Sequence, residues 1–154
     1  MTGPATFVPV DFDPPMELTT GAFRLEPLGP EHNERDYIAW TSSMDHIRTS
    51  PGWGAEQNWP REMTLEENGG DLERHAADFR SRRGFTYTVL DESDDVVGCV
   101  YVYPAKDDVH DARVRSWVRA SEAEHDDDLR SAVAAWLTSD AWPFSRPLYE
   151  PLLF

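Results

Sequence analysis

Residues 84–104 read GFTYTVLDESDDVVGCVYVYP, two apolar runs joined by an acidic turn. Residues 85–90 alternate Phe, Tyr and Val with Thr, Thr and Leu, a pattern typical of a strand. The turn at 91–95 leads into residues 96–103, and the whole stretch predicts an antiparallel hairpin. Because the second run is apolar on both faces, we expect it to lie in the middle of a sheet.

A third strand is predicted downstream of the hairpin, at residues 112–119. Side chains alternate along a strand, so Val114, Ser116 and Val118 share one face. The opposite face carries Arg113, Arg115, Trp117 and Arg119. Three aspartates at 126–128 then precede apolar residues at helical spacing, which predicts a helix. The remaining chain has room for one short strand.

The region upstream of the hairpin begins with an extended arm. Residues 1–20 contain four prolines, which suit neither a helix nor a central strand. Residues 22–28 alternate as a half-buried strand, and Pro30 suits the first position of a helix that runs to about Thr41. A shorter helical piece is predicted at 43–49.

A further helix is predicted from the capping-box spacing of Thr64 and Glu67. We expect Gly69 and Gly70 to interrupt it, and a second helical segment to run from Asp71 to a stop near Gly84. With 154 residues the chain has the length of one domain, so residues 21–154 are predicted to form a single domain behind the arm.

Composition limits the partners and the compartment. The chain has 14 Lys and Arg against 29 Asp and Glu, a net charge of −15 that disfavours nucleic acids and anionic membranes and favours amines. The single cysteine, Cys99, is predicted to be a buried thiol, and the five histidines lack metal-ligand spacing, so no metal site is predicted. No apolar run is long enough to span a bilayer, and we expect a cytoplasmic protein.

The order of these elements, together with the hairpin and the phrases FRLEPLGPEHNERDYIAW (23–40) and RVRSWVRA (113–120), resembles the GCN5-related N-acetyltransferases (GNATs). The resemblance covers about residues 23–149. It implies an α/β (α+β) fold with a mixed, mainly antiparallel sheet flanked by helices. This chain is then a divergent, C-terminally short member that lacks the usual last helix and strands.

The resemblance also implies acetyl-CoA as cofactor and a small amine as substrate. The strand at 113–119 would pair with the pantetheine arm, and the next loop would hold the pyrophosphate on free amides at a helix N-terminus. The implied cofactor-binding residues are Trp117, Val118, Arg119, Asp128, Leu129 and Arg130. However, residues 119–128 contain no glycine and five carboxylates, unlike the glycine-rich loop of the family.

Catalytic and substrate residues follow from the same resemblance and from residue chemistry. Tyr149 is the one C-terminal phenol that could protonate a thiolate, and Asp111, with His110 and Glu67 as alternatives, could act as a base. Substrate contacts are predicted at Arg113, Arg115, Trp53 and Trp59. The alternative for the arginines is ion pairing with the protein's own acids, and for the tryptophans it is core packing.

Two functions therefore remain open. The first is an acyl-CoA-dependent N-acyltransferase that acts on a small amine. The second is a non-catalytic binding or interaction module that has kept the fold and lost the pyrophosphate loop. In the second case, the last strand and the apolar end Leu152, Leu153 and Phe154 could form a homodimer.

Overall fold

Six strands form a single sheet in the computed structural model, which describes residues 6–53 and 58–150. They follow the chain in spatial order: β1 (Leu18–Thr20), β2 (Phe23–Pro27), β3 (Phe85–Leu90), β4 (Val96–Tyr103), β5 (Ala112–Val118) and β6 (Pro147–Tyr149). Neighbours are antiparallel except β5 and β6, which are parallel. The predicted hairpin and the central position of its second strand are confirmed.

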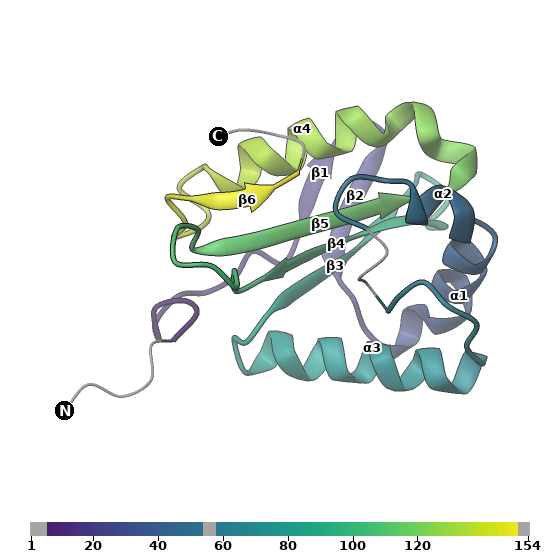
Figure 1. Ribbon diagram of the computed structural model, residues 1–154, viewed down its shortest axis with the longest axis horizontal. Coiled ribbons are helices and arrows are strands. Elements are labelled where there is room, and N and C mark those ends of the chain that lie inside the picture. The colour runs from purple at the N-terminus through teal and green to yellow at the C-terminus, as the bar shows by residue number, and fades with distance from the viewer. Residues whose placement is uncertain (1–5, 54–57, 151–154) are drawn as a thin grey trace.

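Helices cover both faces of this sheet, as Figure 1 shows, with α3 and α4 on opposite sides. A 3₁₀ turn (Pro30–His32) precedes α1 (Asn33–Thr41), and α2 (Met44–Arg48) and α3 (Leu65–Arg80) follow. After β5, a second 3₁₀ helix (Ala120–His125) leads into α4 (Asp126–Leu137). The α/β architecture predicted from the sequence is therefore present.

Alternation along β5 divides the interior into two apolar clusters. Val114 and Val118 face the cluster beneath α4, whereas Trp117 belongs to the cluster beneath α1 and α3. This is the division of faces predicted from the sequence. It places Arg113 and Arg115 on the α3 side of the sheet, because they alternate in register with Trp117.

The predicted interruption at Gly69 and Gly70 is wrong, because α3 is continuous from Leu65 to Arg80. The capping box at its start is present: the Thr64 hydroxyl accepts from the Glu67 amide at 3.1 Å, and Glu67 accepts from the Thr64 amide at 2.9 Å. A Cβ at Gly69 would lie 3.0 Å from the Asn33 side chain of α1. Close packing of α1 on α3 therefore explains a glycine that helix propensity alone disfavours.

The N-terminal arm packs on the sheet. Residues 18–20 form β1 and pair with β2, and Val8 is buried in the α4-side cluster, where Phe7 and Phe12 also pack. The division at residue 20 stays a prediction. Residues 152–154, invoked for a homodimer, lie outside the described residues. None of the helices in the described ranges is long and apolar enough to span a membrane.

Candidate functional site

Two separate surfaces of β5 could take part in a site: its edge beside β6, and the face of the sheet that carries Arg115. At the edge it pairs with β6 only from Ala112 to Val114, opposite Pro147 to Tyr149. β6 then ends while β5 continues to Val118. We call the space beside β5 beyond the Val114–Tyr149 pair the β5/β6 groove.

Side chains of the protein fill the β5/β6 groove. The Ser116 carbonyl accepts from Trp53 Nε1 at 2.9 Å and from Arg130 Nη2 at 3.4 Å. The Ser116 hydroxyl is hydrogen-bonded to the Tyr149 hydroxyl at 2.5 Å. Tyr149 is fully buried, and burial raises the pKa of its phenol to about 12. The carbonyl and the hydroxyl of Ser116 are thus satisfied from within the chain.

Arg130 ties the groove together from α4. Its side chain is 2% exposed, and its Nε donates to Asp126 Oδ2 at 3.0 Å. Nη1 donates to the Glu150 carbonyl at 2.7 Å, Nη2 reaches the Pro51 carbonyl at 3.4 Å, and the guanidinium lies 5.5 Å from the centre of the Tyr149 ring. A buried cation with this many partners is a structural cross-link.

The segment after β5 is coiled into a 3₁₀ helix that uses its own amides. The Ala120 amide donates to the Ser43 hydroxyl at 2.9 Å, and the Glu122 amide donates to the Arg119 carbonyl at 2.8 Å. The Asp126 amide, at the start of α4, donates to the Ala123 carbonyl. These amides point into the protein, and none of these three is available to a phosphate.

The residues of the β5/β6 groove do not fit an acyl-CoA. A pantetheine arm needs the backbone of β5, where Trp53 and Arg130 already occupy the Ser116 carbonyl. A pyrophosphate needs several free amides, whereas the amides of Ala120, Glu122 and Asp126 are already used and the first turn of α4 is three aspartates. Opening this place would require breaking buried hydrogen bonds to a charged side chain.

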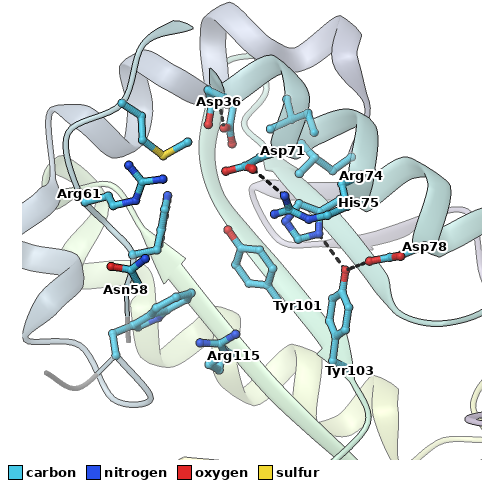
Figure 2. A pocket seen from close by; sticks show the side chains of 16 residues that line it. Asp36, Asn58, Arg61, Asp71, Arg74, His75, Asp78, Tyr101, Tyr103 and Arg115 are labelled. Carbon is cyan, nitrogen blue, oxygen red and sulfur yellow. Dashed lines mark hydrogen bonds and ion pairs between the residues drawn. The ribbon is translucent and has the colours of Figure 1, made fainter. Parts of the chain in front are cut away.

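The face of β5 presents a different surface, a pocket of about 470 Å³ between α3, β4, β5 and the chain after α2. Figure 2 shows its side chains: α3 supplies Asp71, Arg74, His75 and Asp78, and the sheet supplies Tyr101, Tyr103 and Arg115. Trp53, Asn58, Trp59 and Arg61 come from the chain between α2 and α3. We call this the α3 pocket.

A buried carboxylate lies at one end of the α3 pocket. Asp36 of α1 is 4% exposed and accepts from Asn68 Nδ2 at 3.1 Å. Burial raises the pKa of Asp36 to about 6, an effect that the Asn68 hydrogen bond opposes and the charge of Asp71 reinforces. Asp71 itself is paired with Arg74 at 2.8 Å.

A hydrogen-bonded chain of His75, Tyr103 and Asp78 forms one side wall. The Tyr103 hydroxyl donates to Asp78 Oδ2 at 2.9 Å and lies 2.8 Å from His75 Nδ1. Because the phenol has one proton, which goes to the carboxylate, its oxygen accepts from Nδ1–H of the imidazole. Burial, then the charge of Arg74, lowers the pKa of His75 to about 4. The neutral ring therefore keeps an acceptor at Nε2.

Aromatic rings form another part of the wall. Trp53 lies 5.2 Å from Trp59 and 5.6 Å from Tyr101, measured between ring centroids. The guanidinium of Arg115 stacks 4.7 Å from the Trp53 ring. This arrangement can hold a flat apolar group beside a fixed cation.

The structure separates the predicted site residues into two sets. Arg115, Trp53 and Trp59, predicted as substrate contacts, do line the α3 pocket, and Arg113 lies on the adjoining surface. The predicted cofactor residues lie elsewhere: Trp117, Val118, Leu129 and Arg130 are buried, Arg119 is 3.7 Å from Asp95, and Asp128 is on the exposed side of α4.

The predicted catalytic groups do not meet. Tyr149 is buried in the β5/β6 groove, whereas Asp111 accepts from the amides of Ser145 and Arg146 at 2.7 and 3.0 Å. Asp111 therefore orients the turn before β6. The two alternative bases have other partners: Glu67 caps α3, and His110 lies 2.8 Å from Asp107.

Sequence reasoning missed Asp36, Asn68, His75, Tyr101 and Tyr103. One signal was present, since Asp36 precedes Ala39 and Trp40 by three and four positions and so shares their buried face. Within the described chain, no group of three or more His, Cys, Asp or Glu side chains could hold a metal ion. Cys99 is buried, as predicted, and burial raises the pKa of its thiol.

No protein-family model matches the chain, and no curated protein sequence matches it significantly. Solved structures do match its fold. The ribosomal-protein-S5-alanine acetyltransferase from Vibrio fischeri is 15% identical, with a TM-score of 0.61 over 79% of this chain and 66% of that one. RimL, a ribosomal L7/L12 alpha-N-protein acetyltransferase in complex with coenzyme A, is 11% identical, with a TM-score of 0.61 over 81% of this chain and 69% of that one.

A third match is the microcin C7 self-immunity acetyltransferase MccE in complex with acetyl-CoA and AMP. It is 11% identical, with a TM-score of 0.56 over 77% of this chain and 62% of that one. The chain spans less than two thirds of the length of the Vibrio fischeri and MccE structures. These matches confirm the predicted fold class: the chain has the GNAT fold, and its solved structural neighbours are N-acetyltransferases.

Proposed function

We propose that this chain is a GNAT-fold binding protein that takes a small molecule in the α3 pocket without using acyl-CoA. One observation carries the proposal: the backbone of β5 is hydrogen-bonded by Trp53 and Arg130 at its edge, while its face lines a pocket of about 470 Å³. That volume is within the range of small-molecule sites, and aromatic walls with a few placed polar groups are typical of them.

The buried polar groups of the pocket support binding as its purpose. Asp36 and His75 both have pKa values displaced by burial, to about 6 and about 4. Such displaced groups cost folding stability and cluster at functional sites. At the edge of β5, by contrast, the buried polar groups of Ser116, Arg130 and Tyr149 bond to other groups of the chain and so stabilise the fold.

Thermal unfolding in the presence of ligands tests the proposal. A ligand that binds the folded state at one hundred times its Kd stabilises it by about 2.7 kcal/mol. We expect no change in Tm with millimolar acetyl-CoA or CoA, and an increase with members of a small-fragment set of mixed charge. Asn58→Trp, at the exposed rim of the pocket, should abolish that increase, and Asn58→Ala should keep it.

The second candidate function is acyl transfer from acetyl-CoA to an amine. Two observations favour it. The parallel strands β5 and β6 pair over three residues, after which β6 ends and β5 continues alone. In addition, solved acetyltransferases share the fold. The acceptor would be a small amine drawn by the net charge of −15, although some neighbours are named for ribosomal proteins. Saturable stabilisation by acetyl-CoA, with thiol release over an amine panel, would establish this function instead.

A further inference from the structure

The imidazole of His75 has one nitrogen turned toward the sheet and one left for the α3 pocket. Nδ1 lies 2.8 Å from the Tyr103 hydroxyl of β4 and 3.1 Å from the Thr86 hydroxyl of β3. Nε2 makes no hydrogen bond within the described residues, and it is not fully buried there. Because His75 lines the pocket, Nε2 is the nitrogen that a ligand can reach.

Tyr103 and Asp78 fix the proton of this imidazole on Nδ1. The phenol donates to Asp78 at 2.9 Å, so an Nδ1 without a proton would face the phenol oxygen lone pair to lone pair across 2.8 Å. The Thr86 hydroxyl is buried and can accept from the same N–H. While the ring is neutral, Nε2 is therefore an acceptor of hydrogen bonds and not a donor.

The surroundings of His75 favour an uncharged ligand group. Burial, the largest effect, lowers the pKa of His75 to about 4, so a charge is costly at this place. The neighbouring charges have both signs: Arg74 and Arg115 lower this pKa, whereas Asp71 and Asp78 raise it. A charged ligand would thus meet like and opposite charges together. An N–H or O–H donor without a charge suits an acceptor in such surroundings.

A row of aromatic rings leads away from His75 along the pocket. The Tyr101 ring lies 5.6 Å from the His75 ring, and on its other side it lies 5.6 Å from Trp53, both measured between centroids. Trp59 follows at 5.2 Å from Trp53. Figure 2 shows Tyr101 and His75 facing the same space. A ring whose donor reaches His75 would therefore lie along Tyr101 and toward the tryptophans.

We propose that the α3 pocket binds an uncharged, flat aromatic molecule through an N–H or O–H group that donates to His75 Nε2, with its ring against Tyr101 and Trp53. His75 is then the residue that determines specificity, and Tyr103 is the residue that positions it. This assignment rests on the proposed binding function and names its ligand class. It differs from the amine that the fold and the net charge suggest.

Four probes built on one ring system test the assignment: indole, benzofuran, indole-5-carboxylate and 5-(aminomethyl)indole. Benzofuran keeps the shape of indole and lacks its N–H donor, and the other two add a negative or a positive charge. Chemical-shift titration of the full chain at pH 7.5 measures the four affinities. We expect indole to bind about tenfold more tightly than benzofuran, and neither charged probe to bind more tightly than indole.

Variants of the two residues separate recognition from folding. His75→Phe keeps a ring and should reduce the preference for indole over benzofuran to about one, while His75→Gln, whose amide oxygen can accept, should keep part of it. His125→Phe, outside the pocket on the second 3₁₀ helix, is the matched control and should leave the preference unchanged.

The tautomer of His75 gives a readout that a purely structural role would not affect. A long-range proton–nitrogen correlation spectrum of the wild type should show a proton on Nδ1 and none on Nε2. Tyr103→Phe leaves Thr86 as the partner of Nδ1, and since a hydroxyl can donate as well as accept, part of the proton should move to Nε2. The preference for indole should fall in the same variant.

Each contrary result has one consequence. Equal binding of benzofuran and indole, tighter binding of a charged probe, a preference that survives in a folded His75→Phe, or a wild-type proton on Nε2 would overturn the assignment and leave the pocket as the binding site. So would failure of all four probes while members of the fragment set still bind. Failure of the probes and of the fragment set, with saturable binding of acetyl-CoA, would overturn the proposed function itself. Far-ultraviolet circular dichroism and Tm show whether each variant is folded.

Discussion

The edge and the face of β5 use the same kinds of side chain in opposite ways. At the edge, Arg130 is 2% exposed and satisfies carbonyls of three segments. On the face, Arg115 stacks on Trp53 at the wall of a pocket. The comparison teaches that one strand can be cross-linked at its edge and line a pocket on its face, so where a ligand could bind depends on the side chains present rather than on the fold alone.

The largest expected effect on stability comes from replacing Arg130, at the edge of β5. Arg130→Ala removes a buried cation and leaves Asp126 without its partner, which should destabilise the protein by about 3–5 kcal/mol. For a chain of this length that corresponds to a fall in Tm of roughly 10 °C. Arg80→Ala, at the exposed end of α3, should change Tm very little. A normal Tm for Arg130→Ala would show that the groove is not cross-linked as described.

The second effect concerns the pH dependence of stability, which Asp36 of the α3 pocket controls. The pKa of Asp36 is about 6 in the folded protein and near 3.8 when unfolded, a difference worth about 3 kcal/mol. Because the folded state holds the proton more tightly, this contribution to stability is fully present below pH 3.8 and is lost as the pH rises through 6.

Asp36→Asn should therefore be more stable than the wild type at pH 8, by up to about 3 kcal/mol, with the difference vanishing toward pH 4. Urea unfolding across this pH range measures it. Glu34→Gln, an exposed residue of the same helix, provides the control and should show no such pH dependence. Equal stability of Asp36→Asn and wild type at pH 8 would mean that Asp36 is not a strained buried acid.

A smaller effect is expected at Trp53, which belongs to both places. Trp53→Phe removes the Nε1 donor and leaves the Ser116 carbonyl with Arg130 alone, at a cost of about 1–2 kcal/mol. Trp142→Phe is the matched control, because its buried Nε1 has no hydrogen-bond partner among the described residues. The Tm of the Trp53→Phe variant should still not change on addition of acetyl-CoA. A gain of acetyl-CoA binding would mean that Trp53 alone closes the groove.

The smallest effect on stability is expected at Arg113. It is half-buried and has no ion pair within the described residues, so Arg113→Gln should change the free energy of unfolding by less than about 0.5 kcal/mol. Chemical denaturation checks this. A cost comparable with that of Arg130→Ala would make Arg113 a structural residue and remove the distinction between edge and face.

Local patterns in the sequence predicted much of the fold. The alternation of 85–90 and 112–119 gave β3 and β5 with the correct faces, and Thr64 and Glu67 gave the start of α3. The error at Gly69 and Gly70 arose because helix propensity is a local quantity, whereas the contact of α3 with Asn33 of α1 is not. Tertiary packing outweighed the glycine penalty.

The candidate site was predictable only in part. Arg115, Trp53 and Trp59 were singled out by residue type, and they do line the α3 pocket. The pairing of Asp36 with Asn68, and of His75 with Tyr103, joins residues 32 and 28 positions apart. No spacing rule reaches that far without the arrangement of α1, α3 and β4. The contacts by which Arg130 closes the groove are also long-range, because they reach the carbonyls of Glu150 and Pro51.

The six tryptophan indole N–H groups offer the most direct test of the contrast between a closed edge and an open face. A proton–nitrogen correlation spectrum, assigned with single Trp→Phe variants, follows each indole as ligand is added. Millimolar acetyl-CoA should leave all six signals unmoved, while a fragment that raises the Tm should shift Trp53 and Trp59 and not Trp136 or Trp142. A saturable shift of the Trp53 signal by acetyl-CoA, with the Trp59 signal unmoved by every member of the fragment set, would contradict the account.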